Sequence, residues 1–281
     1  MLSDQQFERT RQVALRLAGI ELVERHRELL TRRSQRLGLR DNADLDVLLD
    51  AAEAGEPAAE QRLLSLLTTK FTGFFRHPRH FDWAAEHALG AARRHGKARL
   101  WSAAAATGEE PYSLAMALLE AFAQDAPPAE ILATDVEAGA LEAARLGEYG
   151  ESELKGLTPT RRDRFFIQTG VSGYSVVVPA VSRLVEFRAL NLINVEWNVD
   201  GPFDVIFCRN VLMYLEACHR YSVLERMASL LAPDGLLMLD PAENLGKAGH
   251  LFKAGAEGVY ARRPPARPAG AVTHLTGNQS R

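Results

Sequence analysis

The sequence predicts an α/β protein in which a doubly wound, mainly parallel sheet follows an all-helical N-terminal region. Apolar residues recur at helical spacing through about the first 90 residues. From about residue 97, short apolar runs alternate with helical patterns. Strands that alternate with helices are typical of a parallel sheet covered by helices on both faces. Between 150 and 182 a Gly-containing, β-branched stretch interrupts this alternation and predicts a small antiparallel insertion.

The N-terminal region predicts a helical domain over residues 1–70. Its helices are expected to end near Gly19 and Gly38, because glycine readily takes the left-handed conformation that closes a helix. The helical patterns cover 6–20, 24–37, 43–54 and 58–67.

The second domain is expected to cover residues 71–262, with the insertion at about 150–182 inside it. The predicted strands are 98–103, 130–135, 183–190, 202–210, 236–240 and 259–263, and the predicted helices are 111–123, 139–147 and 216–231. A turn is expected at 233–235, where Pro, Asp and Gly follow one another. The Pro-rich, polar segment 263–281 predicts a flexible tail.

Composition narrows the class of protein. Of 281 residues 47% are hydrophobic and the net charge is −3, which predicts a folded protein that is not a nucleic-acid binder. No apolar run reaches about 18 residues and no signal-peptide pattern opens the chain, so we expect a cytoplasmic protein that does not insert into membranes. Two cysteines, Cys208 and Cys218, are too few for a disulfide framework or a zinc site, and no metal is expected.

The loop after the first predicted strand, within WSAAAATGEEPYSLAMAL (101–118), carries Glu109 and Glu110. A phosphate ligand at this position would call for glycines and backbone N–H groups. The two carboxylates have two explanations: they stabilise a helix N-terminus that begins at Pro111, or they face a cationic ligand. S-adenosylmethionine suits the second, since it carries an ammonium and a sulfonium but no phosphate.

Other polar residues follow the neighbouring predicted strands. Asp135 ends the second strand, where an acidic residue either accepts from ribose hydroxyls or caps the next helix. Arg209, Asn210 and Tyr214 follow the fourth strand at the same carboxyl edge, as a loop network or as part of a site. Arg76 lies in a Phe-rich segment and, if buried, needs a partner, for which a carboxylate is the natural choice.

The order of these motifs resembles the CheR family, S-adenosylmethionine-dependent glutamate O-methyltransferases of bacterial chemosensory systems. The resemblance covers roughly residues 5 to 262 and rests most strongly on SAAAATGEEPYS and FCRNVLMY, with TGFFR, ATDVEAGALEAARLGEY, LNL, LLAPDGLL and AENL in the same order. It implies a class I methyltransferase (Rossmann-like) domain with an antiparallel β insertion after a helical domain. It also implies S-adenosylmethionine as cofactor and S-adenosylhomocysteine as product.

The resemblance also implies roles for individual residues. Arg76 and Tyr214 would lie near the sulfur and the incoming substrate, as the residues that orient the reacting groups. Glu109 is the one acidic residue here that would only cap the helix. The residues that would bind the cofactor are Thr72, Arg76, Glu110, Asp135 (on the ribose), Asn191 and Leu192 (beside the adenine), Arg209 and Asn210.

The sequence departs from the family pattern at three places. Lys70 stands where the family usually has Asn, which removes an expected cofactor contact. Residues 240–244 read DPAEN where GHSEN is common, which changes a loop near the site. The β insertion is short, so we expect no need for a C-terminal pentapeptide tether on the receptor.

The expected substrate is the acidic coiled coil of a chemoreceptor cytoplasmic domain. The first 40 residues contain nine Arg and five acidic residues, and Arg25, Arg32 and Arg36 are spaced to share one helix face. This face is either a docking surface for the receptor or an ordinary solvated face. Two other functions stay open: a small-molecule methyltransferase of the same fold, and a non-catalytic regulatory module that binds S-adenosylmethionine or S-adenosylhomocysteine.

Overall fold

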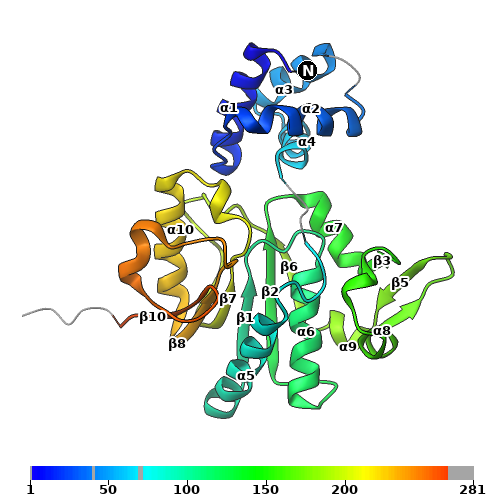
Figure 1. The fold of residues 1–281 in the computed structure, drawn as a ribbon, viewed down its shortest axis with the longest axis vertical. Coiled ribbons are helices and arrows are strands. Elements are labelled where there is room, and N and C mark those ends of the chain that lie inside the picture. The colour runs from blue at the N-terminus through cyan, green and yellow to red at the C-terminus, as the bar shows by residue number, and fades with distance from the viewer. Residues whose placement is uncertain (1, 40–41, 69–71, 265–281) are drawn as a thin grey trace, which may run out of the picture.

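The computed structural model describes residues 2–39, 42–68 and 72–264. Helices at the N-terminus form a lobe above a seven-stranded sheet, and a small three-stranded sheet lies at the side of the larger one (Figure 1). The predicted fold class is confirmed. Lys70 and the tail from residue 265 lie outside the described residues, as does the predicted boundary between the two domains at 70–71.

The N-terminal lobe consists of short helices around a leucine core. Ser3 caps α1 by accepting from the Gln6 backbone N–H at 3.2 Å, and Gly19 at φ 65° ends it. Helices α2, α3 and α4 contribute the buried leucines Leu30, Leu45, Leu49, Leu63 and Leu66, and α1 packs Phe7, Val13 and Ala14 against them. The elements are α1 (Asp4–Ala18), the 3₁₀ turn η1 (Glu24–His26), α2 (Arg27–Arg36), α3 (Asn42–Glu53) and α4 (Pro57–Leu67).

One helix prediction in this lobe needs correction. A continuous helix over 24–37 was expected, but 24–26 is a 3₁₀ turn and the α-helix begins at Arg27. The His26 ring accepts a hydrogen bond from the Val23 backbone N–H at 3.1 Å, which closes the tighter turn. Arg25 therefore does not lie on α2 with Arg32 and Arg36.

The large sheet has the strand order β6-β2-β1-β7-β8-β10-β9. The first five strands are parallel to one another, and β10 is antiparallel to both of its neighbours, β8 and β9. The strands are β1 (Ala98–Ser102), β2 (Ala129–Asp135), β6 (Val185–Ala189), β7 (Phe203–Phe207), β8 (Leu231–Met238), β9 (Phe252–Ala254) and β10 (Val259–Arg262). After β1 the chain adds β2 and then β6 on one side of it. It then crosses back and adds β7 and β8 on the other side of β1. The switch point therefore lies beyond the carboxyl ends of β1 and β7, where such sheets bind ligands.

Helices cover both faces of this sheet. Leu100 and Val205 point to the face covered by α5 and α6, while Trp101 and Ile206 point to the face covered by α10. The helices around the sheet are α5 (Pro78–His95), α6 (Glu109–Phe122), α7 (Ala138–Leu146) and α10 (Ala217–Leu230), with 3₁₀ turns η3 (Leu212–Tyr214) and η4 (Gly246–Leu251). Buried Cys208 belongs to the core as predicted.

Several element boundaries differ from the sequence prediction by a few residues, and two of the differences have a clear local cause. Helix α6 begins at Glu109, so Pro111 is its third residue, where a missing N–H costs no intrahelical bond. Strand β8 begins at Leu231, because the turn predicted at 233–235 is a bulge inside the strand, between the pairs Phe203–Leu231 and Val205–Leu236.

The insertion forms its own antiparallel sheet, as predicted, with strand order β3-β5-β4. Edge-to-face contacts of Phe74 with Tyr149 (4.9 Å between ring centroids) and Phe166 (5.5 Å) join it to the main domain. Its elements are β3 (Glu148–Gly150), η2 (Leu154–Gly156), α8 (Pro159–Phe165), β4 (Phe166–Gln168), β5 (Tyr174–Val177) and α9 (Pro179–Ser182).

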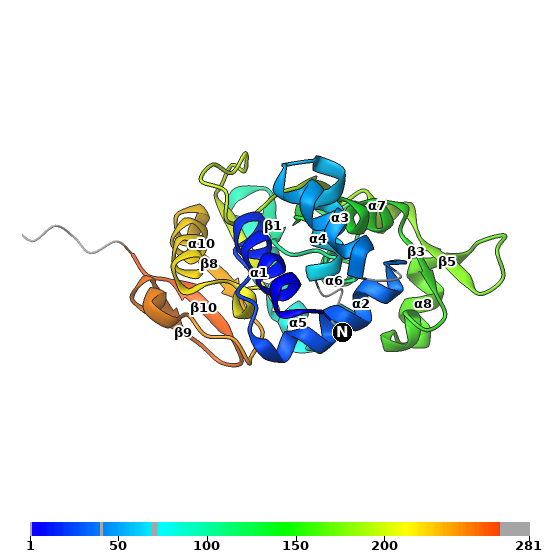
Figure 2. The same ribbon diagram turned by 90° about the horizontal axis from the view of Figure 1, so that it is seen from above.

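The helical lobe lies over the sheet (Figure 2), and it forms hydrogen bonds to the segments that follow the strands. The Glu21 N–H donates to the Tyr214 carbonyl at 2.8 Å, and the Glu216 N–H donates to the Gly19 carbonyl at 2.9 Å. Glu137, buried at the start of α7, accepts from the hydroxyls of Ser65 and Thr68, both at 2.9 Å. Within the described residues, no helix combines the length and hydropathy that a membrane crossing requires.

Candidate functional site

A pocket opens at the switch point, between the helical lobe and the carboxyl ends of the strands. Helix α1 contributes Ala18 to its wall and α4 contributes Leu67. All nine residues that the sequence assigned to the site line this one pocket: Thr72, Arg76, Glu110, Asp135, Asn191, Leu192, Arg209, Asn210 and Tyr214. Their roles toward a ligand stay predictions.

Small residues make room at the pocket floor. Ala103, Ala104 and Ala106 line the pocket in the loop after β1. Gly108, at φ 99°, then turns the chain into α6, and a Cβ there would lie 2.8 Å from the Tyr149 hydroxyl oxygen. The loop therefore brings backbone close to a ligand while α6 presents Glu110 to it.

Glu110 is held between a hydroxyl and a guanidinium. Its Oε1 accepts from Ser102 Oγ at 2.8 Å, and its Oε2 lies 3.3 Å from Arg209 Nη1. Burial raises the pKa of Glu110, and the charge of Arg209 opposes this shift. Arg209 itself is buried, so it requires this counter-ion.

The neighbouring Glu109 has a different environment. It is buried, accepts from the Thr107 hydroxyl at 2.7 Å, and is not among the pocket residues. Burial also raises its pKa. Glu109 is thus a buried residue of the first turn of α6, in keeping with a local structural role.

Asp135 is fixed by two backbone donors at the end of β2. Its Oδ2 accepts from the Ala106 N–H at 2.8 Å and its Oδ1 from the Glu137 N–H at 3.0 Å. Burial raises the pKa of this carboxyl, although both bonds favour its ionised form. The contact with Ala106 ties β2 to the loop after β1, whereas Glu137 is the N-cap of α7, so the capping explanation of Asp135 is wrong.

Arg76 has the carboxylate partner that its sequence context predicted. Its Nη2 lies 3.3 Å from Asp240 Oδ2, and Asn210 Nδ2 donates to the same oxygen at 2.9 Å. The Arg76 carbonyl accepts from Arg209 Nη2 at 2.7 Å. The altered 240–244 segment is therefore part of the polar network at the pocket edge.

Asn191 and Tyr214 connect the pocket to the helical lobe. Asn191 Nδ2 donates to the Leu17 carbonyl at 2.6 Å, while its Oδ1 accepts from the Ile193 N–H. Tyr214 follows the left-handed Asn210 (φ 60°), and its backbone carbonyl accepts from Glu21. Closure of the pocket by the lobe thus depends on residues that also line it.

Sequence reasoning missed three polar residues around the pocket. Ser102 and Glu137 contact the site as described above, and Glu243 accepts from the backbone N–H groups of Asn210, Met213 and Asp240. Burial raises the pKa of Glu243. Two of the three carried a positional signal in the sequence, since Glu137 lies two residues beyond Asp135 and Glu243 lies in the 240–244 segment.

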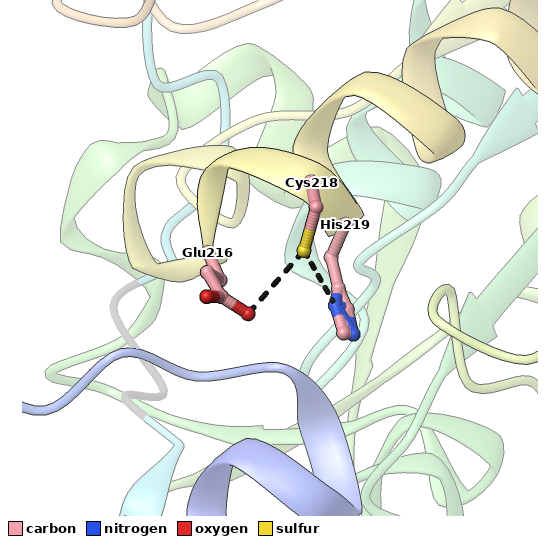
Figure 3. Close-up of side chains that lie close together, drawn as sticks. All are labelled: Glu216, Cys218 and His219. Carbon is pink, nitrogen blue, oxygen red and sulfur yellow. Dashed lines mark hydrogen bonds between the residues drawn. The ribbon is translucent and has the colours of Figure 1, made fainter.

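The described residues hold one group of side chains with the composition of a metal site, and none of its members lines the pocket. Cys218 Sγ is 3.3 Å from Glu216 Oε2 and 3.8 Å from His219 Nδ1, at the start of α10 (Figure 3). Cys218 is exposed, and no ligand role follows from the group alone. That the protein uses no metal stays a prediction.

The pocket suits a cationic nucleoside ligand. Two partly exposed carboxylates, Glu110 and Asp135, have pKa values raised by desolvation, so a cation beside them would relieve an existing cost. The backbone at the floor bears alanines where a phosphate loop has glycines. S-adenosylmethionine, with an ammonium, a sulfonium and no phosphate, fits these donors and acceptors.

Comparison with known proteins agrees with this assignment. A family model described as the SAM-binding domain of CheR methyltransferase matches residues 70–259. The chain is 40% identical over 260 residues to chemotaxis protein methyltransferase 2 of Pseudomonas aeruginosa (90% of this chain, 91% of that protein). It is 41% identical over 267 residues to the chemotaxis protein methyltransferase of Salmonella typhimurium and 39% over 267 to that of Escherichia coli, covering 92% of this chain and 91% of each. The chain therefore belongs to the CheR methyltransferase family, and S-adenosylmethionine is its cofactor.

Proposed function

We propose that this protein transfers a methyl group from S-adenosylmethionine to glutamate side chains of a chemoreceptor cytoplasmic domain. The observation that carries the proposal is one pocket in which acidic residues for a cationic cofactor, Glu110 and Asp135, lie beside Arg76 and Tyr214. Such a site needs a nucleophile from outside, and the helical lobe above it offers a surface for a helical substrate. Because the receptor domain is cytoplasmic, the enzyme would work in the cytoplasm.

The reaction requires no general base. A free glutamate has a pKa of about 4.3, so the substrate carboxylate is ionised at neutral pH. When bound, the cofactor supplies an electrophilic methyl group. A glutamate oxygen would bond to that carbon as the carbon–sulfur bond breaks, and the electron pair of the broken bond would stay on sulfur. The products are a methyl ester and S-adenosylhomocysteine.

The residues of the chain provide orientation and dehydration. Glu110 and Asp135 would hold the cofactor, with Asp135 on the ribose, while Asn191 and Leu192 flank the adenine. Thr72 and Arg76 would close over the methionine end. Fixed alignment of this kind can supply roughly 7–11 kcal/mol of the barrier reduction.

Arg76 and Tyr214 would align the incoming carboxylate with the methyl group. Removal of water around that carboxylate strengthens these contacts but must not neutralise the nucleophile. We expect Arg76→Ala to reduce turnover strongly while the protein stays folded. Near-normal turnover would remove this role.

The receptor would dock on the helical lobe. Arg25, Arg32 and Arg36 are all exposed, although Arg32 already pairs with Glu28. Because Arg25 lies on the 3₁₀ turn, the proposed surface is centred on α2. The short β insertion leads us to propose that no pentapeptide tether on the receptor is needed.

The direct test is transfer of labelled methyl from S-adenosylmethionine to membranes that carry the organism's receptors, followed by mild base. Base-labile label on a receptor band would support carboxyl methylation, and receptors with and without their C-terminal residues would test the tether. No label despite calorimetric cofactor binding would instead favour a regulatory binding module.

A further inference from the structure

A third acidic residue, Asp240, organises the pocket edge from the next strand outward. It lies two residues beyond the end of β8 and is 4% exposed. Its Oδ2 lies close to the nitrogen atoms of three side chains: Asn210 Nδ2 at 2.9 Å, Arg76 Nη2 at 3.3 Å and His77 Nε2 at 3.4 Å. Its Oδ1 accepts from the Ala242 N–H at 3.0 Å.

The two pocket residues in this contact come from distant parts of the chain. Arg76 precedes α5, whereas Asn210 follows β7, and the carboxylate of Asp240 is the group both contact. Asn210 at φ 60° and His77 at φ 58° both have left-handed backbones. Such conformations persist in non-glycine residues only where surrounding contacts hold them.

The environment of Asp240 favours the ionised carboxylate. Burial alone would raise its pKa, but the bonds from Ala242 and Asn210, with the charge of Arg76, outweigh burial and lower the pKa. Asp240 therefore carries a negative charge at neutral pH. A buried charge of this kind binds its cationic partner in a defined place.

We propose that Asp240 is a positioning residue, which holds Arg76 and Asn210 in the geometry that the methyl-transfer pocket requires. It also balances the positive charge of Arg76 close to the anionic nucleophile, so that Arg76 orients the substrate carboxylate without neutralising it. This inference rests on the proposed function for its effect on turnover. Its effect on cofactor affinity rests only on family membership and geometry.

The test compares Asp240→Asn and Asp240→Ala with a matched control on the same strand. Asp234→Asn removes a charge from the β8 bulge, where Asp234 pairs with Arg94 at 2.6 Å and both side chains are about half exposed. We expect Asp240→Ala to lower kcat at least tenfold and to weaken S-adenosylhomocysteine binding by roughly three- to tenfold. Asp240→Asn, which keeps the shape but not the charge, should lose at least fivefold in kcat, while the control stays within twofold.

A double-mutant cycle separates positioning from general destabilisation. If Asp240 acts through Arg76 as well as Asn210, Asp240→Ala should weaken S-adenosylhomocysteine affinity clearly less in the Arg76→Ala background than in the wild-type background, and the part that remains reports on Asn210. Calorimetry measures this affinity even when turnover is too low to follow. Circular dichroism and thermal unfolding show that each variant is folded.

Two results would overturn the inference. One is an equal loss of affinity from Asp240→Ala in the wild-type and Arg76→Ala backgrounds, as a merely structural role would give. The other is a wild-type kcat in Asp240→Asn. If the wild-type protein methylates no receptor, the proposed function fails, while the calorimetric cycle still decides the role of Asp240.

Discussion

The pocket edge and the helical lobe both contain clustered charges, but they hold them in different ways. In the lobe, Arg9 contacts Asp46, Asp50 and Glu53, carboxylates whose side chains are 42% to 70% exposed. At the pocket, Arg209 and its partner Glu110 have side chains only 2% and 13% exposed. Exposed pairs are screened by water, whereas a buried charge that loses its partner has no solvent to replace it.

This difference indicates that the buried charges of the pocket lower the stability of the fold for the sake of function. The carboxyls of Glu110 and Asp135 have pKa values raised by burial, while the pKa of Glu53 in the lobe is lowered by its bond to Arg9. The pocket thus keeps carboxylates where burial disfavours their charge, and a bound cation would offset part of that cost. The four predictions below use this contrast, in order of decreasing effect.

The largest effect is expected from Arg209→Leu. Loss of this cation leaves Glu110 buried without its counter-ion, so we expect a loss of about 3–5 kcal/mol in the free energy of unfolding, and weaker cofactor binding. Denaturant unfolding measures the first and calorimetry the second. In the lobe, Arg9→Leu is the matched control and should cost about 1 kcal/mol or less. Similar losses in both variants would contradict the contrast.

Asp135→Asn should affect binding more than stability. The amide keeps one acceptor for the Ala106 or Glu137 N–H but loses the charge and, if Asp135 binds the ribose as we propose, one acceptor for a ribose hydroxyl. We expect cofactor affinity to fall by roughly ten- to a hundredfold, in line with one charge-assisted hydrogen bond of about 1.5–3 kcal/mol. Calorimetric titration measures this loss. Unchanged affinity would remove Asp135 from the cofactor site.

Cofactor affinity should fall as pH is lowered from 8 toward 5. The pKa values of Glu110 and Asp135 are raised, so they take up protons at higher pH than an exposed carboxyl of pKa about 4, and protonation removes attraction for a cation.

The same shifts predict the opposite sign for the ligand-free fold. Raised carboxyl pKa values mean that the folded protein takes up protons more readily than the unfolded chain, so these two groups should not cause loss of stability in this window. Calorimetry and thermal unfolding across the range measure both trends. An affinity that stays constant down to pH 5 would argue against buried, ionised cofactor ligands.

The smallest effect is expected on the lobe surface. Arg32→Glu with Arg36→Glu should weaken use of the receptor several-fold and leave cofactor affinity unchanged, because both side chains are exposed and far from the pocket residues in sequence. The rate of receptor methylation at low ionic strength measures it. Arg11→Glu, which changes an exposed side chain on α1, is the control. Equal rates for the wild-type protein, the double variant and the Arg11→Glu control would leave α2 without a docking role.

Local patterns in the sequence determined most of the architecture. Helical spacing and the glycines at 19 and 38 located helix ends, and short apolar runs located all parallel strands of the large sheet. Such signals are read from neighbouring residues, so a single sequence suffices. They failed where one element contains a break, as at the 3₁₀ turn before Arg27 and the bulge inside β8.

The site residues likewise show one property that the sequence determined and another that only the tertiary structure decided. The sequence alone determined that Glu110, Asp135, Arg209 and Asn210 follow strands of one sheet, and parallel strands bring their carboxyl ends to a common edge. Only the tertiary structure decided which partners they have. Asp240 meets Arg76 across 164 positions, and Glu137 meets Thr68 across 69. Contacts over such separations depend on how the elements pack, and no local pattern encodes that packing.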